Sequence, residues 1–176
     1  MSSGAFKIET LSPDNFEDHL EGLGALLNAC VHDGASVSFI LPHSQSDSIA
    51  FWSGKVRPAL LAGGRTVLVA IADGRVAGSV QLDCDTPPNQ PHRAEVAKLL
   101  VHPDFRRRGI ARALMVEIEK NARLEGRSLI TLDTASDGAE RLYLSLGYQR
   151  VGAIPGFAKD PLVDRYDATT IMFKTL

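Results

Sequence analysis

The chain has 176 residues, of which 44% are hydrophobic and 23% are charged. This mixture is typical of a folded domain and excludes general disorder, while the length predicts a single domain. Nineteen basic and 21 acidic residues give a net charge of −2, which argues against an extended nucleic-acid or anionic-membrane surface.

Cysteine and histidine usage gives no sign of a metal site. Cys30 and Cys84 stand far apart, so we expect two buried thiols in a reducing compartment, with a disulfide left as the alternative. The five histidines lack metal-ligand spacing, and we expect no metal. Neither a secretory signal nor an apolar run long enough for a bilayer is visible. The chain is therefore expected to be a soluble cytoplasmic protein.

Hydrophobic periodicity predicts alternating strands and helices. In chain order we expect a strand at 5–11, a helix at 13–30, a loop at 32–44, a second helix through 49–60, strands at 65–72, 75–85 and 93–101, a helix from 110 to a cap at Gly126, a strand at 128–134, a helix at 136–147, and strands at 148–154 and 168–176. This order predicts an α/β fold, a mixed sheet covered by helices.

Three local signals support these boundaries. Ser12 and Pro13 resemble a cap followed by proline at the first helical position. Pro58 should kink or shorten the second helix. Asp73-Gly74 joins two apolar runs and predicts a tight hairpin, because both central positions of that turn need positive φ.

The turn Arg106-Arg107-Arg108-Gly109-Ile110-Ala111 lies between a predicted strand and a predicted helix. Gly109 and Ala111 would let another molecule approach the backbone closely. The first amides of a helix have no internal partner, and the helix dipole places about +0.5 charge there. With the arginines, these features predict an anion site suited to a pyrophosphate. The alternative is a solvated arginine-rich turn.

Two motifs resemble those of the GCN5-related N-acetyltransferases (GNAT). They are Arg-x-x-Gly-x-Ala after Val101-x-Pro103, and the later Ala139-x-x-x-Tyr143-x-x-x-Gly147-Tyr148. The resemblance extends over about residues 5–175. It implies a GNAT-type α/β fold, with a mixed, mostly antiparallel central sheet and helices on both faces. It further implies one N-acetyltransferase domain over residues 5–176 and acetyl-CoA as co-substrate.

The resemblance also implies which residues hold acetyl-CoA. Backbone groups of Leu99, Leu100 and Val101 are expected to pair with the acetyl group and the pantetheine arm. The pyrophosphate is expected at Arg106, Arg107, Arg108, Gly109, Ile110, Ala111 and Arg112, mainly through backbone amides. Ser136 and Ala139 complete the set. Many family members carry Asn at the position of Ser136, so the contact of that Asn does not carry over.

Three residues match catalytic positions of the family. Tyr143 matches the tyrosine that hydrogen-bonds the CoA sulfur and donates a proton to the thiolate; the alternative is a core tyrosine. Glu95 and Asp133 match acidic positions proposed as general bases in the tabtoxin-resistance acetyltransferases, a group within that family to which this sequence shows a closer likeness. Strand alternation predicts Glu95 on the same face as Ala97 and Leu99, near the acetyl group. The structural alternatives are an exposed strand carboxylate for Glu95 and a helix cap for Asp133.

Several segments are similar to the tabtoxin-resistance acetyltransferases within that family. They are residues 31–39, 93–101, 132–134 and 150–157 and the ending FKTL. This likeness implies that the acceptor is the primary amine of a small molecule, such as a toxin or antibiotic, and that it attacks acetyl-CoA directly in a ternary complex.

Acceptor-binding residues are expected around residues 32–39 and the first two helices. Candidate apolar surface comes from Trp52, Phe39 and Phe157, and carboxylates that could attract a cationic amine are Asp33, Asp47 and Asp85. Two alternatives are a protein or peptide N-acetyltransferase and a CoA-binding module without catalysis. The resemblance also implies that a homodimer could form; no nucleic-acid or membrane partner is expected.

Overall fold

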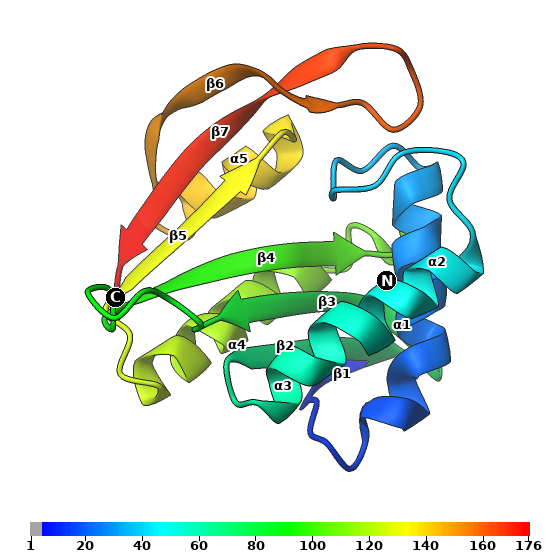
Figure 1. The fold of residues 1–176 in the computed structure, drawn as a ribbon, viewed down its shortest axis with the longest axis horizontal. Coiled ribbons are helices and arrows are strands. Elements are labelled where there is room, and N and C mark those ends of the chain that lie inside the picture. Colours follow the sequence, from blue (N-terminus) through cyan, green and yellow to red (C-terminus); the bar gives the residue numbers. More distant parts are fainter. Residues whose placement is uncertain (1–4) are drawn as a thin grey trace.

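The computed structural model describes residues 5–176, which form one seven-stranded sheet in the order β1-β2-β3-β4-β5-β7-β6 (Figure 1). The strands are β1 (Phe6–Thr10), β2 (Arg65–Ala72), β3 (Arg75–Asp83), β4 (Arg93–Val101), β5 (Leu129–Thr134), β6 (Gln149–Lys159) and β7 (Tyr166–Thr175). Every pairing is antiparallel except that of β4 with β5. The expected mixed, mostly antiparallel α/β fold is confirmed.

Helical segments cover both faces of this sheet (Figure 1). They are α1 (Phe16–His32), α2 (Gln45–Phe51), the π-helical η1 (Trp52–Val56), α3 (Arg57–Leu61), the 3₁₀ turn η2 (Pro103–Phe105), α4 (Ile110–Leu124) and α5 (Asp137–Ser145). Among the described residues, no helix is long and apolar enough to cross a membrane.

Each face has its own hydrophobic core. On one face, Ile110, Leu114 and Ile118 recur every four residues along α4 and are fully or almost fully buried against the sheet. On the other face, Leu27 of α1 and Trp52 of η1 belong to a second buried cluster. Close packing against a buried core on each face holds the strands of the sheet rigidly in place.

The start of α1 differs from the sequence-based expectation. The helix begins at Phe16, and Ser12 instead stabilises the turn that precedes it. The Ser12 amide donates to Asn15 Oδ1 at 2.7 Å, and the Asn15 amide donates to Ser12 Oγ at 3.4 Å. The prediction of Ser12 as the cap of α1 is therefore wrong, because its hydroxyl accepts a hydrogen bond within the preceding turn and not from the first turn of the helix.

The other two local signals hold. Asp73 and Gly74 have φ values of 51° and 72°, as the tight hairpin between β2 and β3 requires. Pro58 lies in the first turn of α3, directly after the π-helical segment, where the Arg57 amide donates to the Trp52 carbonyl five residues back. Proline lacks an amide hydrogen, so the helical register changes at this point rather than continuing unchanged.

The centre of the sheet is split between β4 and β5. The two strands pair over only three residues, ending at Glu95 opposite Thr131. Beyond that pair they diverge, as Figure 1 shows for the green and yellow strands. Backbone groups on the facing edges of both strands are therefore left free of the ladder, and such groups can pair with an extended ligand as they would with a strand.

A β-bulge in β4 changes which face its residues occupy. Ala97 pairs with Gln81 and Leu100 pairs with Ser79, so two residues of β4 stand opposite one of β3. Lys98, in the bulge, has φ +51°. Leu99 consequently packs against the same core as Ala94 and Val96. The expectation that Leu99 shares a face with Glu95 is wrong, because the bulge shifts the alternation.

Candidate active site

A cavity of about 1140 Å³ follows the split between β4 and β5. Its walls come from residues 95–101 of β4, from residues 105–107 and 109–112 around the start of α4, and from most of residues 133–143 across the end of β5 and α5. The loop 33–38 and residues of the β6–β7 hairpin close its other sides. Tyr143, Glu95, Asp133 and most of the expected cofactor-binding residues therefore line one space.

The turn before α4 presents unpaired backbone amides to this cavity. The Ala113 amide donates to the Gly109 carbonyl at 3.1 Å, so the amides of residues 110–112 have no acceptor inside the helix. Gly109 has φ +83°, and a Cβ added there would meet no atom within 4 Å. The open space and the donors beside it fit a diphosphate, because both the amides and the helix dipole favour negative charge.

The arginine side chains of this turn divide into two groups. Arg106 forms an ion pair with Asp33 at 2.6 Å, and Arg108 forms one with Asp73 at 3.1 Å. Arg108 lies over the Phe105 ring and is not part of the cavity wall. Arg107 lines the cavity and is exposed, and it forms no ion pair within residues 5–176. Its guanidinium is thus the one of the three left available to a ligand.

Tyr143 lies in the cavity wall on α5 and is only 5% exposed. Burial, with the negative charge of Asp133 as a second cause, raises the pKa of Tyr143 above its ordinary value. The phenol therefore keeps its proton near neutral pH and is a hydrogen-bond donor. The side chain is both a core residue and part of the cavity, so the two interpretations from the sequence are compatible.

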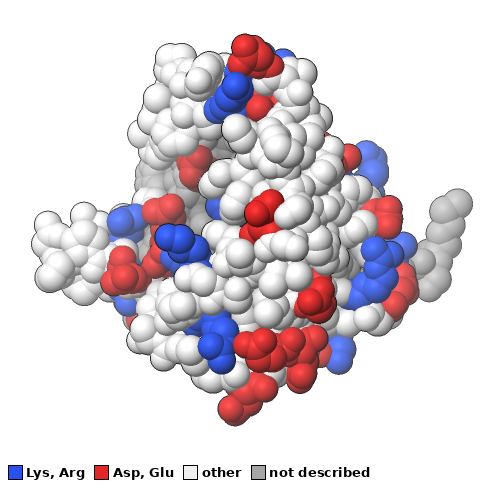
Figure 2. All heavy atoms as spheres, turned by 45° about the vertical axis from the view of Figure 1, so that its right-hand side comes forward, with Lys and Arg blue, Asp and Glu red and all other residues white. Residues whose placement is uncertain are grey.

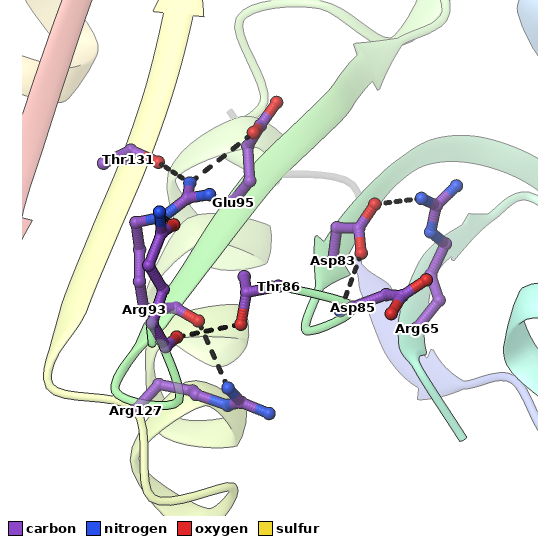
Figure 3. A network of polar contacts seen from close by, with 9 residues as sticks. Arg65, Asp83, Asp85, Thr86, Arg93, Glu95, Arg127 and Thr131 are labelled. Atoms are coloured by element: carbon purple, nitrogen blue, oxygen red, sulfur yellow. Dashed lines mark hydrogen bonds and ion pairs between the residues drawn. The ribbon is translucent and has the colours of Figure 1, made fainter. Parts of the chain in front are cut away.

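Glu95 is held by a small polar network at the closed end of the split (Figure 3). Its carboxylate lies 3.7 Å from the guanidinium of Arg93, which also donates to Thr131 Oγ1 at 2.9 Å and to Gln90 Oε1 at 2.7 Å. Glu95 is exposed and lines the cavity. The network orients a negatively charged carboxylate that substrate can still reach.

Asp133 lies across the split from β4, at the end of β5. Its Oδ2 accepts a hydrogen bond from Thr169 Oγ1 at 2.7 Å. The alternative of Asp133 as a helix cap is wrong, because Ser136 caps α5 by accepting a hydrogen bond from the Ala139 amide at 3.3 Å. Asp133 therefore remains free to act on a ligand in the cavity.

Only some of the residues expected to bind the acceptor line the cavity. Phe157 lines the cavity, whereas Trp52 is fully buried in the second core and Phe39 is not part of the cavity wall. Among the carboxylates, Asp33 lines the cavity but is paired with Arg106, Asp47 forms the capping box of α2 with Ser44, and Asp85 lies outside the cavity wall. These placements follow from tertiary packing, which the local sequence does not reveal.

The cavity also contains residues that sequence reasoning missed. Lys98 and Ser38 meet across its wall through a 3.0 Å hydrogen bond. Thr169 and Arg165 come from β7 and the loop before it. Lys98 lies in the cavity wall with a positive φ, and Thr169 and Arg165 lie there because the β6–β7 hairpin is long. Neither feature has a local sequence signal.

The distribution of surface charge agrees with the near-neutral composition. On the face shown in Figure 2, basic and acidic side chains are interspersed rather than gathered into one basic patch. Both cysteines are free thiols, and Cys30 is buried in the cavity wall. The expectation of a buried thiol is wrong for Cys84, which is half-buried because it follows the last residue of β3. Burial raises the pKa of the Cys30 thiol to about 11, so this thiol is an inert wall residue rather than a nucleophile.

Comparison with known proteins connects this geometry to a family. An acetyltransferase (GNAT) domain model matches residues 63–150, half of the chain. N-acetylaspartate synthetase of Danio rerio is 33% identical over 106 residues, a match that covers 56% of this chain and 36% of that protein. An N-acetyltransferase from the hisH-hisA intergenic region of Azospirillum brasilense is 29% identical over 129 residues, covering 72% of each chain.

A solved structure gives the same result for the fold. The protein yncA of Salmonella typhimurium, solved with its cofactor acetyl-CoA, superposes with a TM-score of 0.77 at 20% identity, covering 98% of this chain and 94% of that one. This identity is low enough that the likeness supports the fold alone. With the domain match, the split sheet and the turn before α4, it follows that the chain belongs to the GNAT acetyltransferase family.

Proposed function

We propose that the protein is an acetyl-CoA-dependent N-acetyltransferase that acts on the primary amine of a small molecule, with residues 5–176 as one catalytic domain. The observation that carries the proposal is the single cavity that joins the amides at the start of α4 to Tyr143, Glu95 and Asp133. A pure binding module would need the amides but neither the buried phenol nor the two accessible carboxylates.

Binding of acetyl-CoA is assigned to backbone more than to side chains. The amides of residues 110–112, with Arg107 beside them, are the donors for the diphosphate. The free edge of β4 at Leu99, Leu100 and Val101 is assigned to the pantetheine arm and the acetyl group. Acetyl-CoA supplies the activated acetyl group as a thioester.

Two proton transfers are needed, and we assign each to a different kind of side chain. An ammonium with a pKa of about 10 is not a nucleophile, so a base must remove its proton. Glu95 is the first candidate and Asp133 the second, because both are carboxylates exposed to the cavity. A backbone amide near Leu100 or Val101 would donate to the oxygen that gains charge. Tyr143, protonated and buried, is the donor to the departing sulfur.

Two features support a small acceptor. The loop 33–38 and the β6–β7 hairpin both contribute to the cavity wall, so the amine end is bounded on more than one side. The Danio rerio relative carries a name that refers to a small acetylated amino acid. The likeness to tabtoxin-resistance acetyltransferases supports a toxin or antibiotic amine and a role in resistance, and the family resemblance supports a homodimer. The two free cysteines support a reducing compartment such as the cytoplasm.

Release of free CoA thiol with a panel of small amines and peptides tests the proposal. We expect release with small amines and little with peptides. Preference for peptides would replace the small acceptor with a protein acceptor. Thermal stabilisation by acetyl-CoA without thiol release from any amine would identify a binding module instead.

A further inference from the structure

Lys98 is the feature of the cavity that the proposed chemistry leaves unused. The residue occupies the bulge of β4 with φ +51°, a conformation that costs energy for a side chain other than glycine. Its partner Ser38, in the loop 33–38, also has positive φ, +79°. Two residues in this uncommon conformation therefore meet through one hydrogen bond, which indicates that the fold holds the ammonium at a defined place.

The ammonium of Lys98 lacks a negative partner. Its Nζ donates to Ser38 Oγ at 3.0 Å and lies 5.7 Å from the centre of the Phe51 ring, and it forms no ion pair with any of residues 5–176. Removal of water by the surrounding protein lowers the pKa of Lys98, while Asp133 and Glu95 oppose that shift through their charges. A half-buried cation whose neighbours are a hydroxyl and an aromatic ring, with no ion pair, has capacity for an anion.

Other cations in the cavity wall are differently engaged or placed. Arg165 forms ion pairs with Asp160 at 2.8 Å and Asp167 at 2.6 Å, and Arg106 forms one with Asp33. Arg107 and Arg112 belong to the turn and first residues of α4 that are assigned to the diphosphate. Lys98 is thus the cation that remains for the acceptor end within the described residues.

We propose that Lys98, positioned by Ser38, binds an anionic group of the acceptor, so that the preferred acceptor is a small amine that also carries a carboxylate. The inference rests on the proposed N-acetyltransferase function. Glu95 and Asp133 attract the ammonium end of such a zwitterion, and Lys98 receives its anionic end. Lys98 is therefore a specificity-determining residue rather than a participant in acetyl transfer.

The test compares ω-amino carboxylates of graded length with the matching ω-amino amides, which keep the amine and remove the negative charge. Wild-type protein should show a kcat/KM at least about tenfold higher for the best carboxylate than for its amide, equivalent to about 1.4 kcal/mol. The difference should lie mainly in KM, because the anion is bound equally before and during the reaction.

Three variants test whether Lys98 causes the preference for the carboxylate over the amide. K98M should reduce the carboxylate-to-amide ratio to near one, and K98E should shift the preference toward an ω-diamine. Lys55→Met, which removes an exposed lysine outside the cavity wall, should keep the wild-type ratio. A ratio that survives in K98M, or a wild-type ratio near one among amines that are acetylated, would overturn the inference while leaving the acetyltransferase function intact.

Two measurements keep the inference testable if a variant does not fold or if no amine is acetylated. If a variant does not fold, propionate should inhibit acetylation of the best ω-amino carboxylate by wild-type protein, whereas propionamide should not. Calorimetric titration of an ω-amino carboxylate into protein saturated with acetyl-CoA should show binding that the matching amide lacks. Absence of thiol release would then reject the enzyme function, and equal binding of acid and amide would reject the role of Lys98.

Discussion

At the turn before α4 the cavity wall comes from one stretch of chain, residues 106–112 without Arg108, whereas at the opposite end it combines β4, β5, the loop 33–38 and the β6–β7 hairpin. The first end offers backbone amides and Arg107, all positive in character. The second end mixes the carboxylates of Glu95 and Asp133 with the ammonium of Lys98. The positive groups at the turn match an anionic cofactor that is always the same. The mixed charges at the other end match an acceptor that can vary.

Variants at the two ends of the cavity should therefore change different kinetic constants. Changes at the turn should alter the affinity for acetyl-CoA, because that end only binds. Changes at the acceptor end should alter turnover or acceptor choice, because proton transfer takes place there.

The largest effect is expected at the carboxylates. Glu95→Gln should lower kcat by about 100-fold, since general-base catalysis contributes about 10²–10⁴-fold. Asp133→Asn should have the smaller effect of the two if Glu95 is the main base. Glu117→Gln, on the surface of α4 and outside the cavity wall, is the matched control and should match wild type in steady-state kinetics. The reverse order of the two effects would make Asp133 the base.

Tyr143→Phe should lower kcat by roughly tenfold to 100-fold while acetyl-CoA affinity stays nearly unchanged, because only a proton donor is lost. Tyr148→Phe is the matched control. Its ring lies 5.6 Å from that of Tyr143, it is 2% exposed, and it does not line the cavity. Steady-state kinetics and calorimetry check both variants. Wild-type turnover in Tyr143→Phe would remove the donor role.

Gly109→Ala should weaken acetyl-CoA binding by about tenfold, because the methyl group enters the space in front of the α4 amides. Gly63→Ala is the control, since Gly63 also has positive φ, +76°, and open space around its missing Cβ, but lies outside the cavity wall. Both should lose about 1–2 kcal/mol of unfolding free energy from left-handed strain. Equal acetyl-CoA affinity in the two folded variants would contradict the diphosphate placement.

The smallest effect concerns pH. Because burial raises the pKa of Tyr143, its protonated form persists as pH rises past the ordinary tyrosine value of about 10. The kcat at saturating acceptor should therefore show no loss between pH 8 and about 10, a window in which an ordinary phenol would begin to ionise. A descending limb below pH 9 that vanishes in Tyr143→Phe would mean that the phenol is not held protonated.

Sequence reasoning succeeded where structure is local. β4 spans Arg93–Val101 as predicted, and α4 begins at Ile110 after a left-handed Gly109, because periodicity and capping are set by nearby residues. The turn 106–112 before α4 is equally local, and its assignment to a pyrophosphate stays a prediction. Family motifs brought Tyr143 and Asp133 into consideration, and the fold places both in one cavity with the turn.

What the sequence could not reveal depends on contacts between distant segments. The bulge at Lys98 arises where β4 pairs with β3, and it reverses the face expected for Leu99. β6 runs to Lys159 instead of ending near 154, because its register with β7 resumes after an irregularity between Ile154 and Ala158. The acceptor end of the cavity depends on the bulge in β4 and on the β6–β7 hairpin, so the sequence predicts it poorly.

A structure of the protein with CoA bound would show directly whether the turn before α4 and the split between β4 and β5 bind the cofactor. We expect the diphosphate against the amides of residues 110–112 with Arg107 beside it, the pantetheine arm along the free edge of β4, and the sulfur beside the Tyr143 hydroxyl. A ligand bound outside the split between β4 and β5, or a diphosphate held away from the start of α4, would contradict this expectation.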